Sequence, residues 1–264
     1  MLKKQIILSC ALILGLSYGL NAAENANAKG LRLAKEIEKG NRGFIGEESE
    51  MEMTLIDAYQ SKTIREMSGK TMETKSDGDK SLMVFKNPKD VKGTKMLTHT
   101  HKSGDDDQWL FLPSLRRIKR ISSRSKTSAF MGSEFSYEDL GSQEIDKYNF
   151  KWIKDFKNKQ GEPHYLLERK PKQKSGYSKM VMVISKKLNS AVKIDYYDRK
   201  GELLKTGLFK KFKSFKIGKN KTIYRAGLIE MNNVQTKKSS IFNWKSRKLG
   251  IKHRKRDFDK KSLN

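Results

Sequence analysis

Two histidines and three aspartates lie close together in the middle of the chain and have the chemistry of a metal site. His99 and His101 are spaced i, i+2 in a segment with strand character, so their side chains would share one face. Aspartates at 105–107 follow directly. Imidazole with carboxylate is a ligand set for zinc or copper. A threonine-flanked surface strand before an acidic turn explains the same residues without a metal, and we expect neither a metal site nor a cofactor.

Acid–base chemistry would need carboxylates, and Glu134, Glu138 and Asp139 are the ones considered. Their spacing gives no sign of a catalytic acid–base pair, in which the pKa of one carboxyl group is raised above that of the other. The sequence also has no Gly-x-Ser-x-Gly elbow, no His-Glu-x-x-His and no glycine-rich phosphate loop. The only cysteine, Cys10, lies near the N-terminus in a predicted leader, which excludes thiol catalysis in the mature chain. We therefore expect a protein that is not an enzyme.

The first 23 residues have the pattern of a secretory signal peptide. Lys3 and Lys4 precede an apolar run at 6–16, and a short segment of small and polar residues ends at Ala22-Ala23. The run is about half of the roughly 20 apolar residues that a membrane span needs. The sequence predicts cleavage, a periplasmic location and one mature domain at 24–264; an uncleaved anchor is the alternative.

Basic residues are concentrated toward the C-terminus. The chain has 57 basic and 30 acidic residues, a formal net charge of +27, and residues 200–264 alone carry 20 basic and 4 acidic groups. Export argues against a nucleic-acid partner. The charge predicts peripheral contact with an anionic membrane or another acidic surface, although a solvated basic face would look the same. The densest cluster consists of Lys210, Lys211, Lys213 and Lys216.

Most of the chain has the alternating pattern of strands. A helix is expected at 28–39, after which Met51, Met53 and Leu55 alternate with polar residues. Turn sequences such as 76–79 and 198–201 separate the segments. Phenylalanines at 209, 212 and 215 are spaced by three, which predicts a bulge or helical turn within the 203–215 strand. The pattern predicts a mainly β (α+β) chain with one strongly curved antiparallel sheet. Further strands are expected at 64–74, 82–85, 96–101, 109–112, 148–156, 165–169, 180–184, 192–197, 223–231 and 234–244.

The segment 109–140 does not fit a plain series of hairpins. It opens as an apolar strand, breaks at Pro113, continues with a basic cluster at 116–120, and becomes a serine-rich polar stretch at 122–128. Aromatic residues and Met131 then appear among small residues. A long polar loop in a compact domain is usually functional or disordered. The apolar residues at its end either form a lid over a hydrophobic cavity or pack over one end of the sheet, and both interpretations stay open.

The residues of this segment carry a family resemblance. The run WLFLPSLRRI at 109–118, followed by FMGS at 130–133 and YEDL at 137–140, resembles the outer membrane lipoprotein-sorting protein family, exported bacterial proteins related to the carriers LolA and LolB. The resemblance extends over roughly 31–263. It implies a single half-open antiparallel β-barrel covered by one or more helices, with an apolar cavity for acyl chains.

The resemblance also implies a function and a site. Members carry lipids or lipoproteins through the periplasm toward the outer membrane and are often encoded near exporters of the resistance-nodulation-division type, which suggests such a partner. The related carriers hold their lid with an arginine, for which Arg116 or Arg117 are candidates here. A sensor or adaptor that binds a membrane protein is the alternative function. The candidate lipid-binding or lid residues are Trp109, Leu112, Arg116, Arg117, Phe130, Met131, Phe135 and Tyr137.

Overall fold

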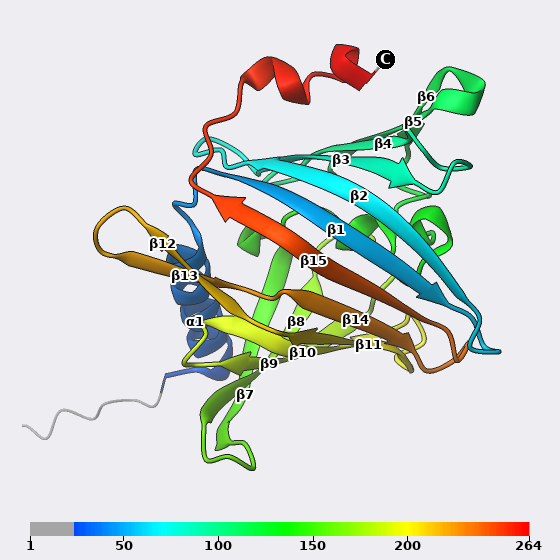
Figure 1. Ribbon diagram of the computed structural model, residues 1–264. Coiled ribbons are helices and arrows are strands. Elements are labelled where there is room, and N and C mark those ends of the chain that lie inside the picture. The colour runs from blue at the N-terminus through cyan, green and yellow to red at the C-terminus, as the bar shows by residue number, and fades with distance from the viewer. Residues whose placement is uncertain (1–23, 264) are drawn as a thin grey trace, which may run out of the picture.

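A computed structural model describes residues 24–263, and the predicted signal peptide lies outside them. Thirteen antiparallel strands form one curved sheet (Figure 1) in the order β6-β5-β4-β3-β2-β1-β15-β14-β11-β10-β9-β8-β7. A separate hairpin, β12 and β13, extends from the sheet. The strands are β1 (Gly46–Ile56), β2 (Lys62–Met72), β3 (Lys80–Asn87), β4 (Lys95–His99), β5 (Asp107–Leu112), β6 (Arg117–Ile121), β7 (Tyr148–Lys157), β8 (Pro163–Pro171), β9 (Lys179–Ser185), β10 (Ser190–Tyr197), β11 (Leu203–Lys210), β12 (Lys213–Ile217), β13 (Lys221–Arg225), β14 (Leu228–Asn233) and β15 (Ser239–Leu249).

The sheet is curved but not closed into a barrel, which corrects part of the expected fold. Its two edge strands are β6 and β7, which follow each other in the sequence but do not pair. The connection between them, residues 122–147, runs between the two halves of the sheet and buries its apolar side chains there. Because these side chains fill the space between the halves, β6 and β7 stay apart. The mainly β character, the antiparallel pairing and the curvature agree with the prediction.

A single long helix, α1 (Ala26–Asn41), packs against the edge strand β7. It contains the predicted helix at 28–39. The Asn25 side chain accepts a hydrogen bond from the backbone N–H of Asn27 and caps its N-terminus. At Gly30 the helix approaches so closely that an added Cβ would lie 2.7 Å from the backbone nitrogen of Trp152. The absence of a side chain at this position allows the close packing. Within residues 24–263, no helix is long and apolar enough to cross a membrane.

The connection at 122–147 contributes to the main hydrophobic core through three short 3-10 turns, η2 (Phe130–Gly132), η3 (Tyr137–Asp139) and η4 (Ile145–Lys147). Phe130 is 0% exposed, and its ring lies 5.9 Å from that of Phe85 in β3. The rings of Phe135 and Phe242 are 4.6 Å apart. These contacts join the connection to both β3 and β15, so the segment is packed as core in this structure.

A second apolar cluster lies on the other side of the sheet, under the C-terminal segment. Two 3-10 turns, η5 (Lys255–Phe258) and η6 (Lys260–Leu263), bury Phe258 and Leu263 against Leu97 of β4. Met96, the neighbour of Leu97, belongs to the main core. Since consecutive strand residues point to opposite faces, the C-terminal segment covers the outer face of β4 and its neighbours.

Two elements differ from the sequence-based expectation. The basic residues that follow Pro113 were expected to begin a polar loop, but Arg117–Ile121 forms β6 and pairs with β5. An edge strand tolerates outward basic side chains, so the alternation of polar and apolar residues in β6 is hard to recognise in the sequence. The expected strand at 203–215 divides at Lys211, which has a φ of 53°. The spacing of three therefore reflects neither a bulge nor a helical turn: Phe209 lies in β11, Phe212 in the link between the strands and Phe215 in β12. The expected strand at 223–231 likewise divides into β13 and β14.

Candidate functional site

An apolar cavity lies between α1 and the second half of the sheet. Its volume is about 530 Å³, within the roughly 300–1,000 Å³ that small-molecule sites occupy. Strands β7–β11, β14 and β15 form its walls with residues 139–145 of the connection. Its apolar lining consists of Ala34, Ile37, Phe44, Ile145, Phe150, Leu167, Met182, Ile184, Ala191, Ile194, Phe209, Phe212, Ala226, Ile229 and Trp244.

Strand register explains why the floor of this cavity is apolar. Leu167 of β8 pairs with Met182 of β9, which pairs with Ile194 of β10. Residues paired across neighbouring strands point to the same face, so the three side chains form a continuous row. Ile184 lies two residues beyond Met182 and extends the floor toward α1. Alternation along each strand thus places one apolar side chain in every two on the cavity side.

One end of the cavity is bordered by α1 and by the base of the β12–β13 hairpin. Asn41 of α1, Phe212 before β12, and Tyr224 and Arg225 of β13 line this end. In Figure 1 the helix and the hairpin lie side by side there. We call this end the mouth. The opposite end contains Arg169, in the row formed by Met180, Tyr196 and Lys205.

Four arginines line the cavity, and two of them have carboxylate partners. Arg42 contacts Asp79 at 3.0 Å, and Arg247 contacts Glu47 at 2.8 Å. Arg225 instead donates to the side-chain and backbone oxygens of Asn41 at 2.7 and 3.1 Å. Arg169, which is 7% exposed, donates to Gln143 Oε1 at 3.0 Å and lies over the ring of Tyr148.

Carboxylates of the lining are mostly engaged within the fold. Asp139 forms an ion pair with Lys205 at 2.7 Å, with side chains 7% and 4% exposed. Burial raises the pKa of Asp79 to about 6. Burial, followed by the nearby Glu144, raises the pKa of Glu38. The cavity therefore combines an apolar floor with charged groups at its ends, an arrangement suited to a ligand that is itself amphiphilic.

None of the eight lipid-binding candidates from the sequence lines this cavity. Phe130, Phe135 and Tyr137 are buried in the core, with Met131 and Leu112 packed partly buried against it. Trp109 belongs to the outer cluster beneath the C-terminal segment. Arg116 and Arg117 are exposed at the junction of η1 (Pro113–Leu115) and β6. The structure thus brings the connection residues together and leaves Trp109 and the two arginines away from them.

Arg65 of β2 contacts the connection at Met131. Its Nη1 donates a hydrogen bond to the backbone oxygen of Met131. Its Nε is buried without a hydrogen-bond partner, and burial lowers the pKa of its guanidinium. The sequence gives no motif around Arg65, so its contact with a segment 66 residues away could be found only from the fold.

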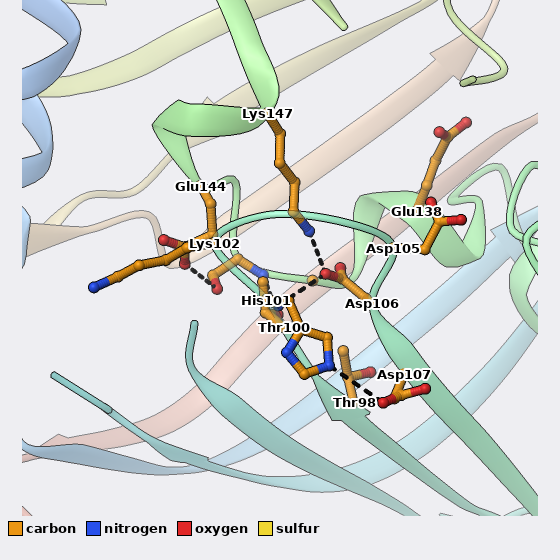
Figure 2. Close-up of polar contacts among 12 residues, drawn as sticks. Thr98, Thr100, His101, Lys102, Asp105, Asp106, Asp107, Glu138, Glu144 and Lys147 are labelled. Carbon is orange, nitrogen blue, oxygen red and sulfur yellow. Dashed lines mark hydrogen bonds and ion pairs between the residues drawn. The ribbon is translucent and has the colours of Figure 1, made fainter. Parts of the chain in front are cut away.

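His99 and His101 do not form a metal centre. His101 lies beyond the end of β4, with Nδ1 2.7 Å from Asp77 and Nε2 3.2 Å from Asp107. Figure 2 shows the second of these contacts and the nearby ion pair of Lys147 with Asp106. His99 contacts the backbone oxygen of Phe258 through Nε2 at 2.7 Å. Among residues 24–263, no three His, Cys, Asp or Glu side chains are placed to hold a metal ion.

The predicted lysine cluster lies close to the mouth of the cavity. Lys211 and Lys213 flank Phe212, which lines the cavity, and they are exposed with Lys216. Lys210 forms an ion pair with Glu230 at 2.7 Å. The cluster therefore borders an apolar opening, with one of its four charges neutralised.

Sequence reasoning missed the cavity lining itself. Its residues are dispersed from Ala34 to Arg247, and they become neighbours only when β7 to β15 assemble. The available signal was the alternation in the segments that form β8, β9 and β10, which marked a buried face. Nothing in that alternation distinguishes a face that lines a cavity from one that is packed.

The chain is similar in both sequence and fold to proteins of known structure. A family model described as an uncharacterised protein matches residues 77–264. A solved domain of an outer membrane lipoprotein-sorting protein from Vibrio parahaemolyticus is 43% identical, with a TM-score of 0.84 over 89% of this chain and 98% of its own. A DUF1329 family protein from Desulfovibrio piger is 25% identical, with a TM-score of 0.83 over 91% and 100%. A LolA superfamily protein from Nitrosomonas europaea, 16% identical, has a TM-score of 0.68 over 88% and 98% and shares the fold. No curated relative matches the chain.

Proposed function

Because the chain belongs to the outer membrane lipoprotein-sorting protein family, we propose that it is a periplasmic, non-enzymatic carrier of lipids or lipoproteins. In this proposal the cavity takes up acyl chains and the protein passes them toward the outer membrane. The observation that carries the proposal is the apolar cavity of about 530 Å³ between α1 and the sheet.

The size and openness of the cavity suit a carrier. Each methylene that leaves water contributes about 0.8 kcal/mol, so a fully buried 16-carbon chain would gain on the order of 12 kcal/mol. A carrier that held its cargo so tightly would release it too slowly. A cavity with an open mouth leaves part of the chain in water and lowers the affinity. Methionine and leucine side chains on the floor, such as Met182 and Leu167, adapt to different chains.

The connection at 122–147 has a second role in this proposal. Its aromatic residues, Phe130, Phe135 and Tyr137, fill the space between the two halves of the sheet beyond the cavity. Displacement of this segment, which Arg65 holds through the Met131 backbone oxygen, would lengthen the cavity for a longer or second chain. The lid residues predicted from the sequence would then act as a movable plug.

The lysines beside the mouth suggest where cargo is exchanged. Lys211, Lys213 and Lys216 would attract an anionic membrane surface to the cavity opening. An inner-membrane exporter of the resistance-nodulation-division type is the partner we propose for loading. In this proposal both contacts would bring the mouth of the cavity, and not its opposite end, against the membrane.

Mass spectrometry of co-purified lipid tests this function. The protein should be isolated from periplasm without detergent and extracted with organic solvent. We expect an acyl lipid in the extract, because no detergent competes with the cavity for the lipid that it carries. Protein that carries no lipid and co-purifies instead with a membrane protein would favour a sensor or adaptor.

A further inference from the structure

We propose that the cavity selects amphiphiles with an acidic head group, and that Arg225 binds this group at the mouth. The inference rests on the acyl-binding function proposed above and adds to it the chemical class of the head group. The class is an oxyanion, a carboxylate or a phosphate, attached to an acyl or alkyl chain.

Arg225 is a cation whose hydrogen bonds go only to neutral acceptors. Nη1 donates to Asn41 Oδ1 at 2.7 Å and to the Tyr224 backbone oxygen at 3.3 Å, and Nη2 donates to the Asn41 backbone oxygen at 3.1 Å. A guanidinium has five N–H donors and stays protonated in proteins. Within residues 24–263, no carboxylate lies at ion-pair distance from it.

The nearest carboxylates are already paired with other arginines. Glu47, Glu73 and Asp79 act on the charge of Arg225 from a distance. Glu47 pairs with Arg247 at 2.8 Å, while Glu73 and Asp79 pair with Arg42 at 3.4 and 3.0 Å. Burial lowers the pKa of the Arg225 guanidinium, because a half-buried charge loses hydration without a compensating partner. An oxyanion from a ligand would supply that partner.

The position of Arg225 fits a head group whose tail enters the cavity. Arg225 lines the mouth beside Phe212 and Tyr224, and the floor of Leu167, Met182 and Ile194 lies farther in. A chain held at Arg225 would therefore run over the apolar floor. Planar guanidinium binds carboxylate and phosphate through paired hydrogen bonds, and Lys211 and Lys213 beside the mouth add attraction for the same charge.

Arg169 at the closed end is the alternative partner for an acidic group. It also lacks a carboxylate at ion-pair distance among the residues described, but Gln143, the Tyr148 ring and Met180 Sδ surround its head group. Glu144, which follows Gln143 in the sequence, lines the cavity as well, and it would disfavour an anion near Arg169. These contacts assign the head group to the mouth, and a variant at each arginine separates the two possibilities.

Three probes of equal chain length test the inference: hexadecanoate, hexadecyl phosphate and hexadecanol. Wild-type protein should bind the acidic probes about tenfold or more tightly than hexadecanol, which is the effect of one hydrogen-bonded charge. Arg225→Gln should remove this difference, so that the three probes bind with similar affinity. Arg169→Gln should keep it. Arg124→Gln, which removes the same charge from an exposed loop position outside the cavity lining, is the matched control.

Each outcome decides the question. Equal wild-type affinity for all three probes overturns the head-group inference and leaves acyl binding intact, whereas no binding of any probe rejects the function on which it rests. Loss of the acidic preference in Arg169→Gln but not in Arg225→Gln overturns the assignment to the mouth. If Arg225→Gln does not fold, the affinities of wild-type protein for the three probes still test the preference for an acidic head group. Arg225→Lys, which keeps the charge, then tests the assignment to Arg225. Tighter binding of hexadecyl phosphate than of hexadecanoate would identify phosphate as the preferred group.

Discussion

At the scale of single residues, the ion pair of Lys205 and Asp139 joins the sheet to the connection. The two side chains are 4% and 7% exposed and 2.7 Å apart, and Lys205 also donates to the backbone oxygen of Glu134. Tyr177 donates to the same aspartate at 2.9 Å. The connection therefore depends on β11 for its position as well as on its aromatic residues.

Asp139→Asn should destabilise the protein by about 3–5 kcal/mol, because it leaves the buried Lys205 ammonium without its counter-ion. Chemical denaturation would measure the free energy of unfolding. The matched control is Glu162→Gln, which breaks an exposed pair with Lys187 whose side chains are 44% and 70% exposed, and which should cost less than about 1 kcal/mol. Similar losses in the two variants would contradict a structural role for the buried pair.

The pKa values of the two histidines near Asp107 should be shifted in opposite directions from the ordinary value of 6.5. The hydrogen bond that the His101 ring donates to the Asp77 carboxylate raises the pKa of His101, whereas burial lowers the pKa of His99. Protonated His101 thus contributes stability that is fully present below pH 6.5 and is lost as the pH rises through its raised pKa. NMR titration of the ring protons would measure both values.

Asp77→Asn is the variant that tests the cause. It should return the pKa of His101 toward 6.5 and change that of His99 much less, because Asp77 contacts the His101 ring. A His101 that titrates at the same pH in wild type and variant would mean that Asp107 alone, at 3.2 Å, sets its protonation.

At the scale of elements, the sequence predicted the parts whose patterns are local. An apolar stripe at helical spacing predicted α1, and alternation with turn residues predicted most strands, because burial of one face of a strand makes every second residue apolar. The edge strand β6 was missed because its outward residues are basic, and the division of 203–215 was missed because the positive φ of Lys211 has no sequence signal. The cavity could not be predicted from the sequence. Arg225 and Leu167 line it together only because of the order of the strands, which no local pattern encodes.

Packing of α1 on β7 should depend on the missing side chain at Gly30. Gly30→Ala would place a methyl group 2.7 Å from the Trp152 backbone nitrogen, and we expect a loss of about 1–3 kcal/mol despite the better helix propensity of alanine. Urea unfolding would measure the loss. Lys35→Ala at an exposed position of the same helix should change stability by less than about 0.5 kcal/mol. A more stable Gly30→Ala protein would show that the helix can move away from the strand without cost.

At the scale of the whole molecule, the open sheet and the uneven charge act together. The two edges remain apart, the connection fills one part of the space between the halves, and the cavity occupies the other. The β12–β13 hairpin continues the wall of the cavity beyond the sheet and carries exposed lysines. The mouth of the cavity and the exposed lysines therefore lie next to each other.

Neutralising the hairpin lysines should weaken binding to anionic vesicles. The variant Lys211→Gln, Lys213→Gln, Lys216→Gln removes three charges worth about 1 kcal/mol each near an anionic surface, so affinity should fall by roughly a hundredfold at low salt. Sedimentation with phosphatidylglycerol vesicles would measure it, and the difference should shrink as salt screens the charges.

The control variant removes the same charge from the other end of β11. Lys200, Lys237 and Lys238 are exposed in the turns before β11 and between β14 and β15. Their combined replacement by glutamine should leave most of the vesicle binding in place. Equal losses in both triple variants would mean that net charge, and not the surface beside the mouth, drives the contact.

Titration with a fluorescent fatty-acyl probe would show whether the cavity binds acyl chains. Wild-type protein should bind one probe per chain, and Ala191→Trp, which places a large side chain in the cavity, should abolish binding without unfolding the protein. Val234→Trp adds the same side chain at an exposed turn and should bind as wild type does. Undiminished binding by a folded Ala191→Trp protein, or no binding by wild type, would mean that the cavity does not take up acyl chains.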